Sequence, residues 1–109
     1  MSYLLRSARF LAAEVLQSAV SPGDTVVDAT MGNGHDTLTL CHLVGPEGTV
    51  IAFDVQESAV ENTRARLAEA GVLDRARLYC LGHERMLEKV AGPVAAVAFN
   101  LGWLPGGNK

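Results

Sequence analysis

The feature that most constrains the fold is an alternation of short apolar runs with segments of helical spacing. The four apolar runs are TVVDA (25–29), TVIAFDV (49–55), RLYCL (77–81) and PVAAVAFNL (93–101). Segments at about 35–44, 56–70 and 84–90 separate them and have helix-like patterns. Apolar strands that alternate with helices are typical of a parallel sheet covered on both faces. The pattern predicts a single α/β unit over residues 1–109, with a doubly wound parallel sheet.

The N-terminal segment is expected to add a further helix, since apolar residues recur at helical spacing over residues 3–19. Arg6, Arg9 and Glu14 interrupt the apolar residues, so the segment does not resemble a signal peptide. No stretch is long enough to span a bilayer. The net charge of −3 excludes a chain that binds nucleic acid through an overall positive charge. We expect a cytoplasmic protein with no membrane partner.

The cysteines and histidines do not predict a metal site. Cys41 and Cys80 show no CxxC spacing and lie in apolar runs, which predicts reduced thiols that fill the core. His35 and His42 are seven residues apart and lack the spacing of metal ligands.

The segment DATMGNGHD (28–36) follows the first predicted strand and is the most informative motif. Gly32 and Gly34 lack a Cβ atom, so the backbone can turn tightly and approach a ligand beside the next helix. No GK[ST] follows, which excludes a P-loop, and Thr37 stands where a dinucleotide fingerprint has glycine or alanine. Asp28, four positions before Gly32, gives a DxxxGxG pattern that resembles the first motif of S-adenosylmethionine (SAM)-dependent methyltransferases. Its carboxylate suits the cationic end of SAM.

An acidic residue, Asp54, ends the second predicted strand, 20 residues beyond Gly34. A carboxylate at this position can accept hydrogen bonds from both hydroxyls of a ribose. The alternative is that Asp54 caps the helix that begins near Gln56. The loop and the spaced acid together favour a nucleoside cofactor.

Polar and aromatic residues follow the third and fourth predicted strands. Asn100 and Trp103, in NLGWLPGG, are similar in order to the Asn/Asp-Pro-Pro-aromatic motif of amino-group methyltransferases, with Leu101 and Gly102 in place of the prolines. Alternatively, Asn100 caps a turn and Trp103 is a core or interface aromatic. His83, after the third strand, faces the cofactor near the adenine, helps to deprotonate the acceptor, or serves as a structural hydrogen-bonding residue.

Together, VVDATMGNGHDTLTL, AFDVQESAV, LGHE and AFNLGWLPGGNK resemble the YtqB/MnmM-like rRNA methylase family. The resemblance implies a Rossmann-like class I methyltransferase fold, SAM as cofactor, and tRNA as partner, methylated on the exocyclic amine of 5-aminomethyl-2-thiouridine at the wobble position. It also implies the site residues. Asp28, Gly32, Asn33 and Gly34 would hold the methionine end, with Met31 beside them; Asp54 and Gln56 would bind the ribose and adenine side, His83 the adenine region, and Asn100 and Trp103 would act as the catalytic pair facing the acceptor.

Members of this family continue past the fourth strand, so the chain is expected to be the N-terminal part of a longer enzyme. An unpaired fourth strand, Val94 to Phe99, would then expose an apolar edge, which predicts a homodimer through that edge. Three alternatives remain: a SAM-binding fragment without an acceptor site, an rRNA methyltransferase, and a nucleotide- or NAD-binding domain.

Overall fold

The computed structural model describes residues 9–12, 19–90 and 92–99. Its elements, in chain order, are β1 (Arg9–Ala12), β2 (Thr25–Asp28), α2 (His35–Val44), β3 (Thr49–Asp54), α3 (Glu57–Glu69), the 3₁₀ helix η2 (Leu73–Arg75), β4 (Ala76–Cys80), the 3₁₀ helix η3 (His83–Glu88) and β5 (Ala96–Phe99). The four predicted strands and the three helical segments between them are therefore confirmed. Among the described residues, no helix combines the length and the apolarity needed to cross a bilayer.

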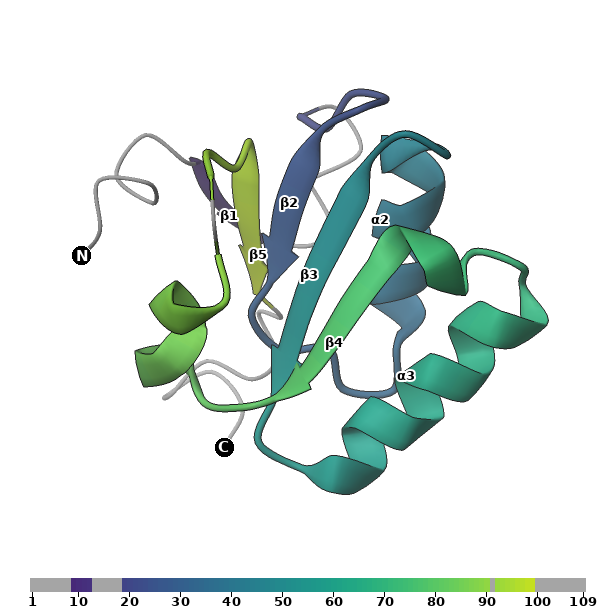
Figure 1. The fold of residues 1–109 in the computed structure, drawn as a ribbon, viewed down its shortest axis with the longest axis vertical. Coiled ribbons are helices and arrows are strands. Elements are labelled where there is room, and N and C mark those ends of the chain that lie inside the picture. The colour runs from purple at the N-terminus through teal and green to yellow at the C-terminus, as the bar shows by residue number, and fades with distance from the viewer. Residues whose placement is uncertain (1–8, 13–18, 91, 100–109) are drawn as a thin grey trace.

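The strands form one parallel sheet in the order β1-β5-β2-β3-β4 (Figure 1). From β2 the chain moves outward to β3 and β4, and then returns to place β5 on the other side of β2. The strand order therefore reverses between β2 and β5. In open parallel sheets, ligands bind at the carboxyl ends of the strands beside such a reversal.

The two faces of the sheet have separate cores. On one face, α2 and α3 contribute buried side chains such as Leu40 and Leu67, which pack against Val26 and Val50 of the sheet. On the other face, the alternate strand positions pack against η3 and the segment after it; these residues are Val27, Ile51, Phe53, Val97, Met86, Val90 and Val94. Figure 1 shows α2 and α3 together on one side of the sheet and η3 on the other. Both faces of β2 and β3 are buried, as the apolar runs predict, whereas no residue of the edge strand β4 is buried.

The predicted N-terminal helix is wrong over the part that the structure describes. Arg9–Ala12 forms β1, which pairs in parallel with all four residues of β5. These residues form a strand despite their helical spacing, because as a strand they supply hydrogen-bond partners to the backbone of β5. The expected open edge on the fourth predicted strand is wrong for the same reason: β5 lies between β1 and β2.

The two cysteines differ from each other. Cys41 is buried in α2, as expected, but Cys80 at the end of β4 is exposed. The prediction that Cys80 fills the core is therefore wrong. Its thiol lies 3.5 Å from the carbonyl oxygen of Val55 and donates to it.

Candidate functional site

The glycine-rich loop between β2 and α2 runs along the carboxyl end of β3. Asp28, the last residue of β2, pairs with Ala52, and β3 continues two residues further to Asp54. The loop follows this extension: the N–H of Met31 donates to the carbonyl of Phe53 at 2.9 Å, and the N–H of Gly32 donates to Oδ2 of Asp54 at 3.0 Å. The glycine loop and the strand-end acid are thus in direct contact, although 22 residues separate Gly32 from Asp54.

Two glycines give the loop its shape. Gly32 and Gly34 have φ angles of 55° and 91°, in the left-handed region that side chains disfavour. A Cβ atom on Gly34 would also lie 2.9 Å from Oγ1 and 3.0 Å from Cα of Thr63 in α3. Gly34 therefore allows both the turn into α2 and the close approach of the loop to α3.

Asp54 is held by backbone donors on both sides. Its Oδ2 accepts from Gly32, and its Oδ1 accepts from the N–H of Gln56 at 2.9 Å. This second donor, Gln56, precedes α3, so Asp54 binds the chain just before the helix and, among the described hydrogen bonds, accepts from no N–H of α3 itself. Each carboxylate oxygen has two lone pairs, so one acceptor position remains on each oxygen. A half-buried carboxylate in this state can accept two hydroxyl donors without losing its own support.

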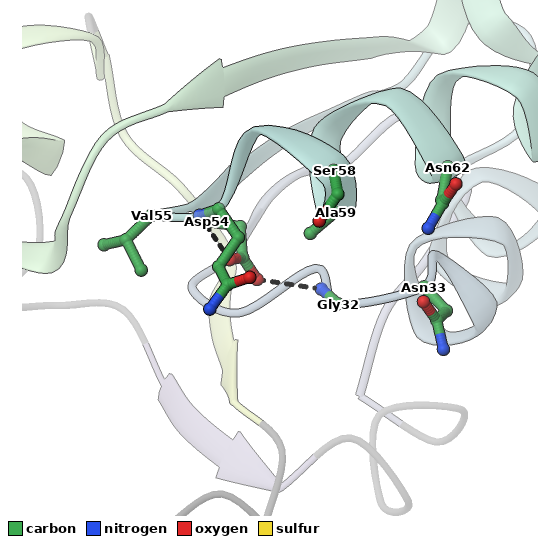
Figure 2. A pocket seen from close by; sticks show the side chains of 8 residues that line it. Gly32, Asn33, Asp54, Val55, Ser58, Ala59 and Asn62 are labelled. Atoms are coloured by element: carbon green, nitrogen blue, oxygen red, sulfur yellow. Dashed lines mark hydrogen bonds between the residues drawn. The ribbon is translucent and has the colours of Figure 1, made fainter.

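A cavity of about 320 Å³ opens beside this carboxylate (Figure 2). Its walls come from the loop, from the end of β3 and from the first turns of α3; the lining residues are Gly32, Asn33, Asp54, Val55, Gln56, Ser58, Ala59 and Asn62. Figure 2 shows Asn33 on the loop and Asn62 on α3 at one end of the cavity, and Val55 at the other. Val55 is 70% exposed, an unusual exposure for a valine, and offers an apolar surface to a flat ring. The cavity thus joins one carboxylate, three amide side chains, one hydroxyl and two apolar side chains.

Asp28 lies underneath the loop, with 2% of its surface exposed. Its Oδ2 accepts from the hydroxyl of Thr37 at 2.6 Å, and its Oδ1 accepts from the N–H of Thr30 at 3.2 Å. Burial raises the pKa of Asp28 to about 6; the hydrogen bonds from Thr37 and Thr30 oppose this rise, while Asp36 and Asp54 add to it. The structure thus shows Asp28 binding the loop to α2, and its direct contact with a cofactor stays a prediction.

Two side chains that the sequence does not single out hold the loop from α3. Thr63 donates through Oγ1 to the carbonyl of Gly32 at 3.2 Å, and Arg66 donates through Nε to the carbonyl of Asn33 at 2.9 Å. These partners are 31 and 33 residues apart in the chain. The only signal in the sequence is that Thr63 is a polar residue on the apolar face of the predicted helix.

The structure brings four of the predicted residues to the cavity, namely Gly32, Asn33, Asp54 and Gln56. Met31 is 2% exposed and packs against the core instead. His83 begins η3 after β4, and its side chain is not among those described. Asn100 and Trp103 lie outside the described residues, so the predicted catalytic pair stays a prediction.

Three comparisons with known proteins find relatives of this chain. A family model described as "Putative rRNA methylase" matches residues 50–109. A tRNA (mnm(5)s(2)U34)-methyltransferase, chloroplastic, of Arabidopsis thaliana is 42% identical over 95% of this chain and 42% of its own length. The crystal structure of an rRNA methylase of Clostridium thermocellum is 46% identical, with a TM-score of 0.79, over 87% of this chain and 51% of its own.

A second solved structure carries a ligand. It is a methyltransferase from Streptococcus mutans in complex with SAH, S-adenosylhomocysteine; its TM-score is 0.73 and its identity 38%, over 86% of this chain and 51% of that one.

The fold is therefore the Rossmann-like α/β fold of class I methyltransferases. Within that class, the chain belongs to the rRNA methylase family. It spans about half the length of the relatives that it matches.

Proposed function

We propose that this chain is the SAM-binding part of an RNA methyltransferase. The observation that carries the proposal is the position of Asp54, whose carboxylate faces a cavity of about 320 Å³ and is held by the N–H groups of Gly32 and Gln56. A carboxylate at the end of the strand that follows a β-loop-α unit, here β3, is the expected acceptor for ribose hydroxyls. The SAH complex of the Streptococcus mutans relative supports the same ligand class.

The chemistry of the lining fits SAM better than it fits a dinucleotide. A pyrophosphate needs backbone N–H groups that point at it. In this loop the N–H of Gly32 donates to Asp54, and the N–H of Gly34 donates to the carbonyl of Met31 at 2.8 Å. A nucleoside without phosphate needs no such cradle, and the ribose and adenine would instead meet Asp54, Gln56 and Val55.

SAM, when bound, supplies a methyl group on a positively charged sulfur that is already a good leaving group. The protein must therefore position the acceptor rather than activate the donor. A primary amine attacks only when neutral, and a free alkylamine titrates near pH 10, so the acceptor site must lower that pKa by desolvation or accept the amine proton. We assign the contacts with the acceptor to Asn100 and Trp103, which follow β5 in the sequence. The amide oxygen of Asn100 would accept a hydrogen bond from the neutral amine, and the ring of Trp103 would stack on the base; neither side chain takes up the amine proton.

The finer part of the proposal is the substrate, the exocyclic amine of a modified wobble uridine in tRNA. The printed activity of the Arabidopsis thaliana relative supports it. So does topology: Ala98 of β5 pairs with Asp28, so the carboxyl end of β5 lies beside the start of the glycine loop. Asn100 would then reach the acceptor from the same edge that holds the cofactor.

A second candidate is methylation of rRNA. The description of the family supports it, as do small-subunit rRNA methyltransferase H proteins, one of which, from Cupriavidus metallidurans, is 34% identical over 90% of this chain. That chain is matched over only 30% of its length. The Arabidopsis thaliana relative has the higher identity and coverage, so tRNA is the first choice.

Two experiments test the proposal. Calorimetry with SAH and with NAD measures the ligand class, and we expect saturable binding of SAH alone. Methyl transfer from labelled SAM is then measured on tRNA that carries the unmethylated aminomethyl group and on undermethylated small-subunit rRNA. Label in the tRNA alone supports the first candidate, and label in the rRNA alone replaces it with the second.

A further inference from the structure

The glycine loop has two consecutive carbonyl groups that accept hydrogen bonds from one face of α3. The carbonyl of Gly32 accepts from Thr63 and that of Asn33 from Arg66, at 3.2 and 2.9 Å. Thr63 and Arg66 are three residues apart, so they lie on the same side of the helix. Two neighbouring peptide groups of the loop are thus bound to one rigid element.

The hydrogen bond from Thr63 to the Gly32 carbonyl involves a fully buried side chain. Thr63 has 0% of its surface exposed, so its hydroxyl must find a partner inside the protein. Gly34, whose missing Cβ atom allows the approach to Thr63, fixes the distance between the loop and α3. The absence of a Cβ atom on Gly34 thus lets the buried Thr63 hydroxyl reach the carbonyl of Gly32.

The orientation of Gly32 connects this contact to the cavity. Its carbonyl is bound to Thr63 on one side, and its N–H is bound to Asp54 on the other. A shift of Gly32 away from α3 would also remove one of the two backbone donors that orient the Asp54 carboxylate. Through Gly32, Thr63 thus acts on the acceptor for the ribose.

Arg66 holds the part of the glycine loop that follows Gly32. Asn33 lines both the cavity beside Asp54 and a second cavity of about 310 Å³, whose other lining residues are Asn62, Ala65, Arg66 and Glu69. The bond from Arg66 to the Asn33 carbonyl therefore holds a loop residue that lines both spaces. Without this bond, Asn33 would lose its described hydrogen bond to α3.

We infer that Thr63 and Arg66 are positioning residues that clamp the glycine loop to α3 and so keep Gly32 and Asp54 in the geometry that binds the nucleoside. Neither side chain needs to contact the ligand. The inference rests on the proposed function, because its effect on affinity requires SAH to bind at this cavity.

The test uses the 109-residue chain and four variants. Thr63→Val keeps the shape of the side chain and removes the hydroxyl, whereas Thr63→Ser keeps the hydroxyl. Arg66→Met keeps an unbranched apolar stem and removes the guanidinium donors. Arg64→Met is the matched control, because Arg64 lies on the same helix, is exposed and contacts only Glu61 among the described residues.

The first measurement is the affinity for SAH by calorimetry, with thermal unfolding recorded in parallel. We expect a loss of about fivefold to twentyfold for Thr63→Val and for Arg66→Met, as for the loss of one hydrogen bond, and a change of less than about twofold for Thr63→Ser and Arg64→Met. Unchanged affinity in folded Thr63→Val and Arg66→Met would overturn the inference. So would equal losses in Thr63→Val and Thr63→Ser, since the hydroxyl would then not be the cause.

The second measurement is amide hydrogen exchange of Gly32 and Gly34 without ligand, which does not depend on the proposed function. We expect faster exchange of these two amides in Thr63→Val and Arg66→Met, while the amides of β3 keep their protection. Unchanged loop exchange would contradict the clamp. If the wild-type chain does not bind SAH, the proposed function fails, and the exchange measurement decides the clamp on its own.

Discussion

The glycine-loop region and the β1–β5 edge of the sheet differ in how their conformations are determined. In the loop region, conformation depends on individual residues: glycines with positive φ, an acid at the end of β3, and donors on α3. At the β1–β5 edge it depends on which backbone groups find a partner, because Arg9–Ala12 pairs with β5 despite a helix-like spacing. Local chemistry determines the first region, and tertiary context determines the second.

The largest expected effect follows from Asp54→Ala. This change removes the acceptor for both ribose hydroxyls, and hydrogen bonds to a charged group are worth about 1.5 to 3 kcal/mol each. The affinity for SAH should therefore fall by more than about a hundredfold, measured by calorimetry. Asp74→Ala, at an exposed acid in η2, is the control and should leave the affinity unchanged. Retained affinity in Asp54→Ala would show that the Asp54 carboxylate does not bind the ribose.

The second prediction concerns the buried carboxyl of Asp28. Its folded-state pKa of about 6 is above the value near 3.9 of an unfolded aspartate, so the folded chain binds more protons between these values. The free energy of unfolding should therefore fall by about 3 kcal/mol in total as the pH rises from about 3 to about 7, most steeply between the two pKa values, and this contribution should be constant at higher pH. Denaturant unfolding across this range measures the slope.

Asp28→Asn should lose this contribution to the pH dependence, because the amide does not ionise in that range. Asp74→Asn, at an exposed acid, should keep the wild-type slope. An identical slope in wild type and Asp28→Asn would show that Asp28 does not titrate as its burial implies.

The third prediction compares the loss of stability on replacing two glycines that both have positive φ, Gly34 and Gly71. Gly34→Ala brings a Cβ atom to 3.0 Å from the Cα of Thr63, whereas the position of a Cβ atom on Gly71 has nothing within 4 Å. Both changes strain the backbone by about 1 kcal/mol, and the contact with α3 should add about 1 to 2 kcal/mol for Gly34→Ala alone. Thermal unfolding of both variants measures the difference. Equal losses of stability would mean that the loop can move away from α3 at no cost.

The smallest effect is expected at the other region. Leu11→Pro removes one N–H from the edge strand β1, so it should lower the free energy of unfolding by about 1 kcal/mol or less. Ile51→Pro, in the central strand β3, should prevent folding. In the wild-type chain, the chemical shifts of Arg9–Ala12 should be those of a strand. Helical chemical shifts at these residues would contradict the pairing of β1 with β5 and support the helix that the sequence predicts.

The sequence predicts the parts of the fold in which each residue type has one dominant physical consequence. The limits of α2 agree with the structure to the residue, and those of α3 to within one residue, because Gly34, Gly45 and Gly71 mark the ends of the helices. The sequence also predicts that the glycine loop and Asp54 belong to one ligand site, whereas the hydrogen bond from Gly32 to Asp54 appears only in the structure. These features depend on short segments and on the known geometry of parallel sheets.

The rest depends on contacts between distant segments, which spacing cannot reveal. Thr37 argues against a dinucleotide motif in the sequence, yet in the fold it donates to Asp28 and helps to bury it. Thr63 and Arg66 reach the loop only after α3 packs against it. The sequence does not reveal the pairing of β1 with β5 for the same reason, since a short segment with three apolar residues suits a strand or a helix equally well.

The most direct test of the cofactor site is the amide chemical shift of each described residue during titration with SAH. We expect the largest changes at Gly32, Asn33, Asp54, Gln56 and Asn62, with saturation at a single affinity. Changes that cluster instead at the opposite end of the sheet, around Thr25, Val90 and Val94, or no changes at saturating SAH, would contradict the account.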